Sequence, residues 1–320
     1  MPYIAHADHR VFYEIEGPAD GAVYVMVNGL TQYASLWRPY VAALTAGGFR
    51  VATFDLLGQG HSDKPALFIS QDDQVEILRA LVAEFAGRPV FLAGISFGGL
   101  IALRYATRYP QTLTGLVAMS TFAELPPQLQ LIGAALRNGL VLGGISYLQD
   151  LLLPMNLSDA WLGAHMADLD AIKRPGWLNN DVYALQNLME SFIGFTPLTP
   201  DLPQITVPTL ILNGEFDFLT PRPLHETLRR GIPDSALVIV PRAYHAFTLE
   251  RPGLTAMLLR KFAGEVAAGS FVGGGSIWIA PETDNGEVIA FPAGFDPMRA
   301  LPVAPSTPLP AMPPLAASTS

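Results

Sequence analysis

The chain contains no cysteine among its 320 residues. Disulfides, a thiol nucleophile and cysteine-ligated zinc or iron-sulfur sites are therefore excluded, although reducing and oxidising compartments both fit this absence. Charged residues make up only 15% of the chain, and its formal net charge is -9. Because no run of Lys or Arg supplies a basic surface for phosphate groups, we expect no nucleic-acid partner.

Two kinds of apolar segment are also missing. Residues 1–10, MPYIAHADHR, show no basic stretch followed by an apolar one. We therefore expect no secretory signal and a cytoplasmic location. Arg137 and Asp150 interrupt the most apolar region, so we expect no transmembrane helix and no stable membrane insertion. Hydrophobic residues still form 50% of the chain, enough for the core of one large α/β domain.

The stretch VFLAGISFGGL at residues 90–100 is the most informative part of the chain. Its apolar beginning is typical of a buried parallel strand, and the helical pattern LIALRYATRY follows the G-x-S-x-G segment. So tight a turn leaves no room for side chains at Gly94 and Gly98. The pattern therefore predicts that Ser96 is exposed as a nucleophile, with the N–H of Phe97 aimed at a developing negative charge.

A second loop complements this turn. The apolar run AVYVMV at residues 22–27 predicts a buried strand, which ends in Asn28, Gly29 and Leu30. In a serine hydrolase a second N–H that binds the oxyanion comes from the loop after such a strand. Leu30, which follows a permissive glycine, is the predicted donor.

Two further polar residues follow predicted strands. Asp217 comes shortly after the apolar run PTLILN, and His245 comes shortly after ALVIVP. The carboxyl ends of parallel strands meet at one edge of a sheet, where Ser96 also lies. The chain order Ser96, Asp217, His245 is the order of a serine hydrolase of this architecture.

Other polar residues near strand ends receive lesser roles. His61 lies in the glycine-rich turn GQGHS, and we expect it to be a solvated residue of a structural turn. Glu124 also follows a predicted strand and is the alternative to Asp217 as the acidic partner of the histidine. We expect Glu215 to point elsewhere and to contribute little.

Alternating apolar strands and amphipathic helices predict a mostly parallel sheet with helices on both faces, formed by residues 1–120 and 204–267. Between them the alternation stops, and residues 125–155 carry only Arg137 and Asp150 as charges. We expect residues 121–203 to form a helical cap over the strand ends, with its apolar surface buried against the site. A helical part of the ordinary core is the alternative.

The C-terminal part has a different composition. Residues 268–300 predict an appended hairpin around an Asn-Gly turn at Asn285. Residues 301–320 are rich in Pro, Ala, Ser and Thr, and we expect them to be disordered. We assign no chemistry to this part of the chain.

The segments GISFG, DLLGQGHSDKP, NGEFD and AYHAF, spread over residues 10–267, resemble the α/β-hydrolase superfamily. The resemblance implies an α/β-hydrolase fold in which Ser96 is the nucleophile and His245 is the general base and then acid. Asp217 would orient His245 and stabilise its cationic form. The sequence departs from the usual pattern at Asn28, where the family commonly has histidine. VMVNG and DDQVEILRALVAEF are also similar to an acyltransferase subfamily that makes hydroxyacyloxy-alkanoate lipids, although GISFG lacks that subfamily's tryptophan.

These observations favour a serine esterase that needs no cofactor or metal and cleaves esters or thioesters with an apolar acyl group. The alternative is an acyltransferase that passes the acyl group to a hydroxyacyl acceptor. A non-catalytic receptor or scaffold would have no need of all three polar residues. Haloalkane dehalogenation or epoxide opening needs a carboxylate where the chain has Ser96, while perhydrolysis by the same residues stays open. The natural substrate, the acceptor and the oligomeric state are left open.

Overall fold

The computed structural model of the chain describes residues 2–283 and 286–295. Its strands join in one sheet with the order β1-β2-β4-β3-β5-β6-β7-β8-β9-β10. From β4 to β9 in that order, neighbouring strands are parallel, whereas β1, β2 and β10 pair antiparallel. The strands are β1 (Tyr3–His6), β2 (His9–Glu16), β3 (Val23–Val27), β4 (Arg50–Phe54), β5 (Val90–Ile95), β6 (Gly115–Met119), β7 (Thr209–Gly214), β8 (Ser235–Val240), β9 (Ser276–Ile279) and β10 (Ile289–Phe291).

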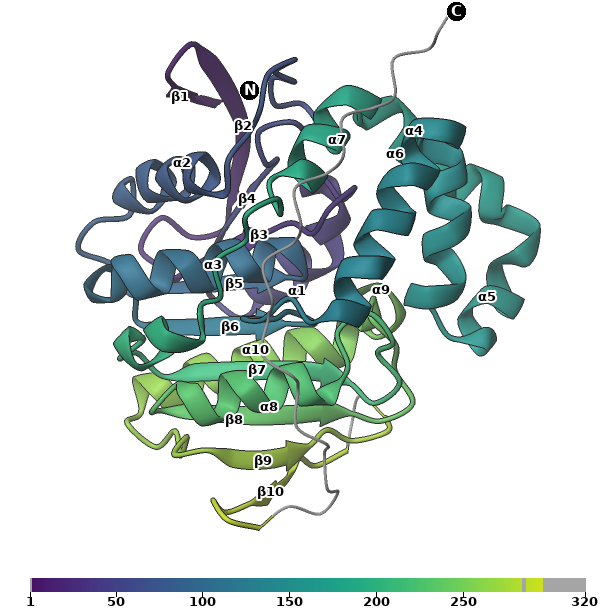
Figure 1. Cartoon of the computed structure of the whole chain (residues 1–320). Coiled ribbons are helices and arrows are strands. Elements are labelled where there is room, and N and C mark those ends of the chain that lie inside the picture. Colours follow the sequence, from purple (N-terminus) through teal and green to yellow (C-terminus); the bar gives the residue numbers. More distant parts are fainter. Residues whose placement is uncertain (1, 284–285, 296–320) are drawn as a thin grey trace, which may run out of the picture.

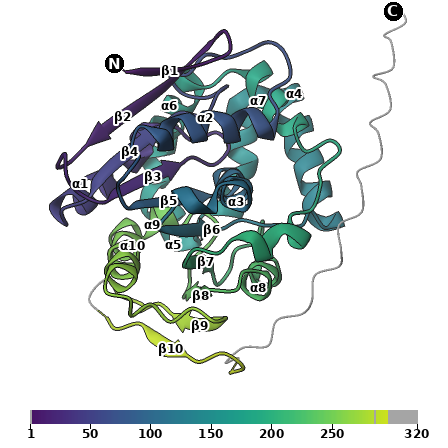
Figure 2. The same ribbon diagram turned by 90° about the vertical axis from the view of Figure 1, so that its left-hand side faces the viewer.

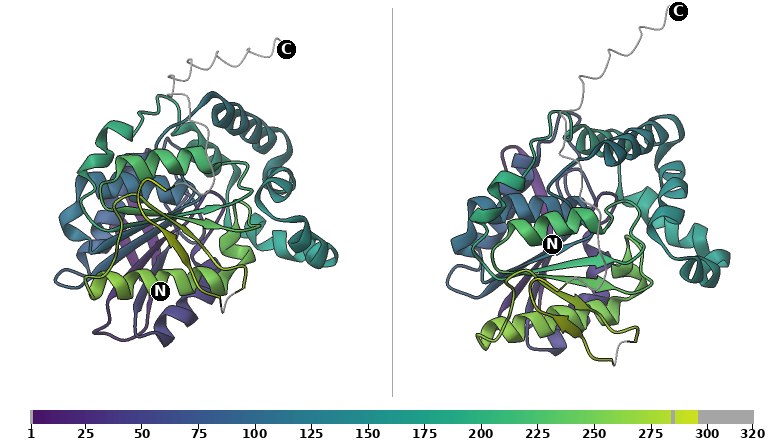
Figure 3. Two further views of the ribbon diagram at one scale, coloured as in Figure 1. Left: turned by 90° about the horizontal axis from the view of Figure 1, so that it is seen from below. Right: turned by 60° about the horizontal axis from the view of Figure 1, so that its bottom comes forward.

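Helices cover both faces of this sheet, as the alternation of strands and helices predicted (Figures 2 and 3). Helices α2, α3 and α8 contribute to the core on one face, and α1 and α10 contribute to the core on the other. The expected α/β-hydrolase architecture is confirmed. The bounds are α1 (Arg38–Ala46), α2 (Gln71–Ala83), α3 (Phe97–Arg108), α8 (Arg222–Gly231), α9 (Phe247–Glu250) and α10 (Pro252–Ala267), with short 3-10 helices at Ala34–Trp37, Pro110–Thr112, Met166–Asp168 and Thr199–Gln204.

The apolar runs of the central strands are continuous because both of their faces are buried. Along β3, Val25 and Val27 belong to the core on one face, while Tyr24 and Met26 belong to the core on the other. This alternation follows from the two-residue period of a strand.

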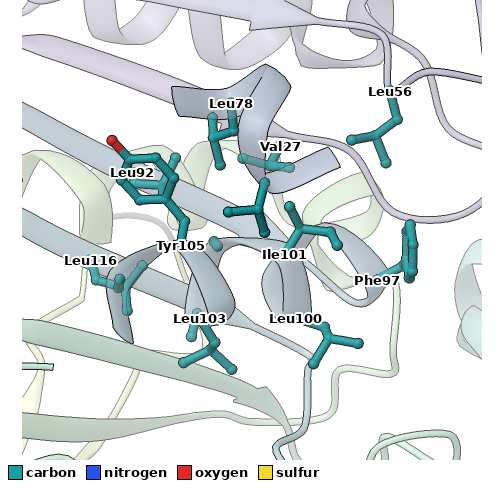
Figure 4. Packing of buried hydrophobic residues seen from close by; sticks show 14 of the residues in the cluster. Val27, Leu56, Leu78, Leu92, Phe97, Leu100, Ile101, Leu103, Tyr105 and Leu116 are labelled. Carbon is teal, nitrogen blue, oxygen red and sulfur yellow. The ribbon is translucent and has the colours of Figure 1, made fainter. Parts of the chain in front are cut away.

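Helix α3 packs directly on the sheet and fixes the position of the turn that precedes it. Its residues Leu100 and Ile101 lie among Val27 and Leu92 of the central strands (Figure 4). All four side chains are fully buried, and each such burial typically stabilises the fold by about 2 kcal/mol. The start of α3 is therefore held rigidly at the strand ends.

Four helices between β6 and β7 lie beyond the ends toward which the parallel strands point, and we refer to them as the cap (Figure 1). They are α4 (Pro127–Asn156), α5 (Asp159–His165), α6 (Leu169–Asn179) and α7 (Val182–Glu190). Helix α4 is broken at Gly144, where φ is 72° and ψ is -171°. The arms 127–143 and 145–156 fold back on each other. Their close approach is seen at Gly139, where a Cβ atom would lie 2.6 Å from Leu151 of the other arm.

By length and composition, α4 is apolar enough to cross a membrane, with a mean hydropathy of 1.3 over 18 residues. From the sequence we expected no transmembrane helix, because Arg137 and Asp150 interrupt this region. A mean hydropathy tolerates such isolated charges, so the two criteria give different results. The break at Gly144 leaves two arms, each shorter than the roughly 20 residues that a spanning helix needs. Only 28% of this 18-residue stretch of α4 is buried, and Leu131 and Leu142 are exposed. The expectation that the cap buries its apolar surface is therefore met only in part.

The segment after α10 corrects another expectation. We expected residues 268–300 to be appended to the domain, but β9 pairs in parallel with β8 and extends the central sheet. The physical reason is burial: Ile277 and Trp278 of β9 are 1% and 5% exposed and complete the core at this edge. Strand β10 then pairs antiparallel with β9, as a hairpin requires. The turn residue Asn285 and the tail 301–320 lie outside the described residues.

Candidate functional site

The turn between β5 and α3 holds Ser96 in a backbone conformation that side chains rarely adopt, with φ 54° and ψ -120°. Its two glycines are required by close packing. A Cβ atom on Gly94 would lie 2.4 Å from the oxygen of Gly98, and one on Gly98 would lie 2.2 Å from the oxygen of Asn28. The turn is thereby pressed against the loop that follows β3.

The three residues expected to act together do lie together. The Nε2 atom of His245 is 3.1 Å from the Oγ atom of Ser96, and its Nδ1 atom is 3.0 Å from each carboxylate oxygen of Asp217. Asp217 and His245 are 3% and 6% exposed. A continuous chain of hydrogen bonds therefore connects a serine hydroxyl, an imidazole and a buried carboxylate, which come from three separate loops at one edge of the sheet.

The carboxylate of Asp217 is held in place by the residue that ends its own loop. Thr220 donates its N–H to one carboxylate oxygen over 2.8 Å and its hydroxyl to the other over 2.7 Å. Burial alone would raise the pKa of Asp217, but its interactions with His245, His225 and Thr220 outweigh this and lower the pKa. Asp217 is therefore ionised at neutral pH and oriented toward Nδ1 of His245.

A pair of residues after β6 ties the backbones of Ser96 and His245 together. Ser120 donates its hydroxyl to the carbonyl of His245 over 2.8 Å, and Thr121 donates its hydroxyl to the carbonyl of Ser96 over 2.8 Å. The N–H of Thr121 in turn donates to Nε2 of His225 over 3.1 Å. Burial lowers the pKa of His225 to about 4, so this imidazole is neutral and able to accept.

Sequence reasoning missed this pair and its histidine. The available signal was a Ser-Thr dipeptide directly after the buried strand GLVAM, in the same relation to β6 that Ser96 has to β5. Ser120 also has a positive φ of 42°, a strain that a sequence does not reveal.

The loop after β3 lies beside the turn that carries Ser96, as expected. Asn28, which replaces the usual histidine, does not face the site. Its Nδ2 atom donates to the carbonyl of Phe54, and its Oδ1 atom accepts from the indole of Trp37. Asn28 is fully buried and anchors the loop to the core. The substitution therefore has a structural role that needs no imidazole.

The two amides predicted to bind an oxyanion remain available. In the described part of the chain, neither Leu30 nor Phe97 donates its N–H to another protein group. Gly29, by contrast, donates to the side chain of Gln32 over 2.9 Å, which fixes the loop. Leu30, Ser96 and Phe97 all line one cavity. An unpaired N–H beside a serine hydroxyl is the arrangement that stabilises an oxyanion.

That cavity has a volume of about 700 Å³ and lies between the sheet edge and the cap. Its lining is mostly aliphatic and aromatic. The charged side chains that reach it are neutralised by partners: Arg137 by Glu190, and Lys173 by Asp150. Polar residues such as Gln130, Gln149 and Asn156 complete the lining. The cavity is thus suited to an uncharged, largely apolar ligand.

The residues given lesser roles lie apart from the hydrogen-bond chain. The side chain of His61 is 54% exposed, and its backbone N–H donates to the buried carboxylate of Asp55, so it is a solvated turn residue. Glu124 accepts a hydrogen bond from Thr199 and does not line the cavity. Glu215 accepts from the N–H of Arg242. Among the described residues, no group of three or more His, Asp or Glu side chains could hold a metal ion.

A mostly parallel sheet with helices on both faces, and a serine at the turn after its central strand, define an α/β hydrolase. The family described as serine aminopeptidase, S33, matches residues 18–252, so the chain belongs to this family of α/β hydrolases.

Similar proteins include ester-cleaving enzymes. A Pantoea ananatis protein provisionally assigned as the carbamate hydrolase RutD is 30% identical over 252 residues, which cover 76% of this chain and 89% of the relative. The pimeloyl-[acyl-carrier protein] methyl ester esterase of Neisseria meningitidis serogroup C is 28% identical and covers 63% of this chain and 79% of the relative. The solved α/β hydrolase MGS-M2, from a deep-sea metagenome of the Medee basin, is 26% identical with a TM-score of 0.75, covering 82% of this chain and 97% of that one.

Proposed function

We propose that the protein is a serine hydrolase that cleaves carboxylic esters or thioesters with an apolar acyl group. The observation that carries the proposal is the hydrogen-bond chain from Ser96 through His245 to Asp217, which opens into a mostly apolar cavity. A methyl ester esterase among the similar proteins supports esters as the substrate class. In this proposal the three residues form a catalytic triad, and the N–H groups of Leu30 and Phe97 form the oxyanion hole.

The first half-reaction forms an acyl-enzyme. The Oγ atom of Ser96 bonds to the acyl carbon while its proton passes to Nε2 of His245, 3.1 Å away. The carbonyl oxygen becomes negative and is held by the N–H groups of Leu30 and Phe97. The bond to the alcohol or thiol then breaks, and the leaving group takes the proton from His245. Asp217 stabilises the histidine while it is cationic.

The second half-reaction reverses these roles. A water molecule bonds to the acyl carbon while His245 accepts its proton, and the proton then returns to Oγ of Ser96 as the acyl bond breaks. The products are a carboxylic acid and the regenerated enzyme. The ester and one water molecule supply all the atoms of the products, and His245 returns to its starting protonation state.

The character of the cavity favours an apolar acyl group. Leu129, Ile132 and Leu136 of α4 line it together with Met189 of α7. Arg137 is neutralised by Glu190 and Lys173 by Asp150, so the Lys and Arg side chains among the described residues of the lining offer no unpaired cation to a charged end of an acyl chain. Burial of one methylene is worth about 0.8 kcal/mol, so a medium-length chain gains several kcal/mol over acetate before ordering costs.

The second candidate is acyl transfer to a hydroxyl group of another acyl molecule, through the same acyl-enzyme. The cap favours it, because a mostly apolar cavity under α4 and α7 limits the water that competes with an acceptor. Hydrolysis remains the first choice because it needs no second binding site.

The test of the proposal is a comparison of wild type with Ser96→Ala. Wild type should turn over p-nitrophenyl esters and be labelled by a fluorophosphonate, and the variant should lose both while keeping its circular dichroism spectrum. The loss should be several orders of magnitude in kcat. Ser270→Ala, at an exposed position after α10, is the matched control and should behave as wild type. Normal labelling of Ser96→Ala would overturn the proposal.

A second experiment tests the acyl group. With p-nitrophenol as the constant leaving group, kcat/KM should rise at least about tenfold from the two-carbon to the eight-carbon acyl chain. Ile132→Ala, inside the cavity, should reduce this rise, and Leu142→Ala, exposed on the same helix, should not. A profile that peaks at acetate would contradict the apolar acyl pocket.

A further inference from the structure

We infer that Asn180, a residue of the cap, positions the N–H of Leu30 in the proposed oxyanion hole by keeping Thr31 in a strained backbone conformation. The inference rests on the proposed function, because it gives a residue outside the triad a task in the same reaction. In the described part of the chain, the cavity lining does not include Asn180. We therefore assign it as a positioning residue and not as a catalytic one.

The N–H of Leu30 belongs to a tight turn formed by residues 29–32. The N–H of Gln32 donates to the carbonyl of Gly29 over 3.3 Å, and the N–H of Gly29 donates to the side chain of Gln32 over 2.9 Å. Leu30 and Thr31 are the two central residues of this turn. The direction of the Leu30 N–H therefore depends on the conformation of the turn.

Thr31 has a φ of 67°, a value that side chains rarely adopt. Glycine or asparagine usually supplies a positive φ at the third position of a turn, and threonine is unfavourable there because its Cβ atom is branched. A conformation of this kind persists only where the surrounding structure enforces it. Relaxation to a negative φ would rotate the peptide group between Leu30 and Thr31 and displace the Leu30 N–H.

The side chain of Asn180 holds Thr31 in this conformation. Its Nδ2 atom donates to the carbonyl of Thr31 over 3.0 Å and to the carbonyl of Gly176 over 3.1 Å. Both partners can only accept, so the amide must direct its NH₂ group toward them. The bond to Thr31 joins residues 149 positions apart and connects the cap to the turn.

Asn180 is itself fixed between the cap and the core. It lies between α6 and α7 and is 8% exposed (Figure 1). Its backbone forms an isolated antiparallel bridge with Gln59, which is fully buried in the glycine-rich turn after β4. Among the described residues, its Oδ1 atom is buried without a hydrogen-bond partner. An unpaired buried oxygen is destabilising, so the amide is better explained by its bond to Thr31 than by stability.

The cap then contributes to the chemical step as well as to binding. An oxyanion donor must lie within about 2.7–3.1 Å of the oxygen that becomes negative, so a small displacement weakens the transition state more than the bound ester. Loss of the Asn180 side chain should therefore lower kcat and leave KM nearly unchanged.

The test compares wild type with Asn180→Ala on p-nitrophenyl octanoate. Loss of one whole oxyanion donor lowers kcat about 10²–10³-fold, and displacement should cost less, so we expect kcat to fall about 10–100-fold with KM changed less than about threefold. The pH profile of kcat/KM should keep its midpoint, because the triad is not altered. Asn180→Leu, which is similar in volume and also lacks the donor, repeats the test if the alanine variant does not fold.

Two inhibitors separate the oxyanion from the rest of the ligand. With octyl trifluoromethyl ketone, the Oγ atom of Ser96 bonds to the carbonyl carbon, its proton passes to His245, and the carbonyl oxygen becomes the oxyanion. Octyl p-nitrophenyl ether fits the same cavity but has no carbonyl group. In Asn180→Ala, the affinity for the ketone should fall by about the same factor as kcat, and the affinity for the ether should change less than about twofold.

Asn187 offers a matched control, because it is also a cap asparagine that donates to the backbone of the core. Its Nδ2 atom donates to the carbonyl of Leu67 over 3.0 Å and to the carbonyl of Pro65 over 3.3 Å. None of these three residues belongs to the described lining of the cavity. Asn187→Ala should therefore leave kcat and the affinity for the ketone as in wild type.

A second substitution tests whether the effect passes through Thr31. Glycine adopts a positive φ without strain, so a turn with Thr31→Gly needs less support from Asn180. Added to Asn180→Ala, this change should restore most of the lost kcat and of the lost affinity for the ketone. A purely structural role of Asn180 would give no such recovery.

The outcomes separate the inference from the proposed function. Unchanged affinity for the ketone in Asn180→Ala, or an equal loss in Asn187→Ala, would overturn the inference and leave the proposed hydrolase intact. Failure of Thr31→Gly to restore kcat would overturn it as well, because the effect would not depend on the strained turn. If wild type cleaves no ester and Ser96 is not labelled by a fluorophosphonate, the proposed function fails and the inference fails with it.

Discussion

Replacing Asp217 by Asn removes the negative charge and one acceptor from the centre of the proposed triad. In wild type the carboxylate accepts from Nδ1 of His245 at 3.0 Å and from both the N–H and the hydroxyl of Thr220. An asparagine amide keeps only one acceptor oxygen. If its nitrogen faces Nδ1, the imidazole must carry its proton on Nε2, which is the wrong tautomer for a base beside Ser96. A comparable change in a serine protease lowers kcat about 10⁴-fold, equivalent to about 5 kcal/mol of barrier.

The assay is single-turnover acylation by a p-nitrophenyl ester, followed together with the unfolding midpoint in urea. We expect Asp217→Asn to lose about three to four orders of magnitude in acylation rate while its unfolding stays cooperative. Glu124→Gln and Glu215→Gln are the matched controls, since both change a carboxylate to an amide near strand ends outside the hydrogen-bond chain. Acylation that is lost in Glu124→Gln but retained in Asp217→Asn would refute the assignment of the acid.

Three further predictions follow from the site. Thr121→Val removes one of the two hydrogen bonds to the carbonyl of Ser96 and leaves the one from the N–H of Leu100, so we expect a loss of about 0.5–1.5 kcal/mol in unfolding free energy and a fall in kcat, whereas Thr121→Ser should restore both. Gly98→Ala places a Cβ atom 2.2 Å from a backbone oxygen and should cost about 2 kcal/mol, whereas Gly264→Ala, on α10 with nothing within 4 Å, should be neutral or stabilising; urea unfolding of both tests this. Burial lowers the pKa of His225 from its usual 6.5 to about 4, which gives stability that is complete above pH 6.5 and lost as the pH falls toward 4, by about 3 kcal/mol. His225→Gln should lose less stability over that interval, and equal losses in the two proteins would contradict this.

The residues of the site could be found from the sequence because each follows an apolar run. Ser96, Asp217 and His245 all come at or shortly after the ends of parallel strands, and parallel strand ends meet at one edge of a sheet. The G-x-S-x-G spacing expresses a steric need, as the contact between Gly98 and the oxygen of Asn28 shows. Local pattern and topology were therefore sufficient to bring the three side chains together.

The features that sequence reasoning missed depend on contacts between distant segments. The hydrogen bonds from Ser120 and Thr121 to the carbonyls of His245 and Ser96 join residues 125 and 25 positions apart. The place of β9 in the sheet depends on the exposed edge of β8, which a short apolar run does not reveal. The break in α4 arises at Gly144, where a glycine in an apolar helix pattern gave no sign of a reversal.

The central claim is that Ser96 carries the acyl group of an ester during turnover. The most direct measurement is intact mass after rapid acid quench with p-nitrophenyl esters of graded chain length and with 3-hydroxyacyl thioesters, followed by peptide mapping. The account predicts one added acyl group per chain on the peptide that contains Ser96, with greater accumulation for medium chains and none in Ser96→Ala. Turnover with no adduct on Ser96, or the same adduct in Ser96→Ala, would contradict it.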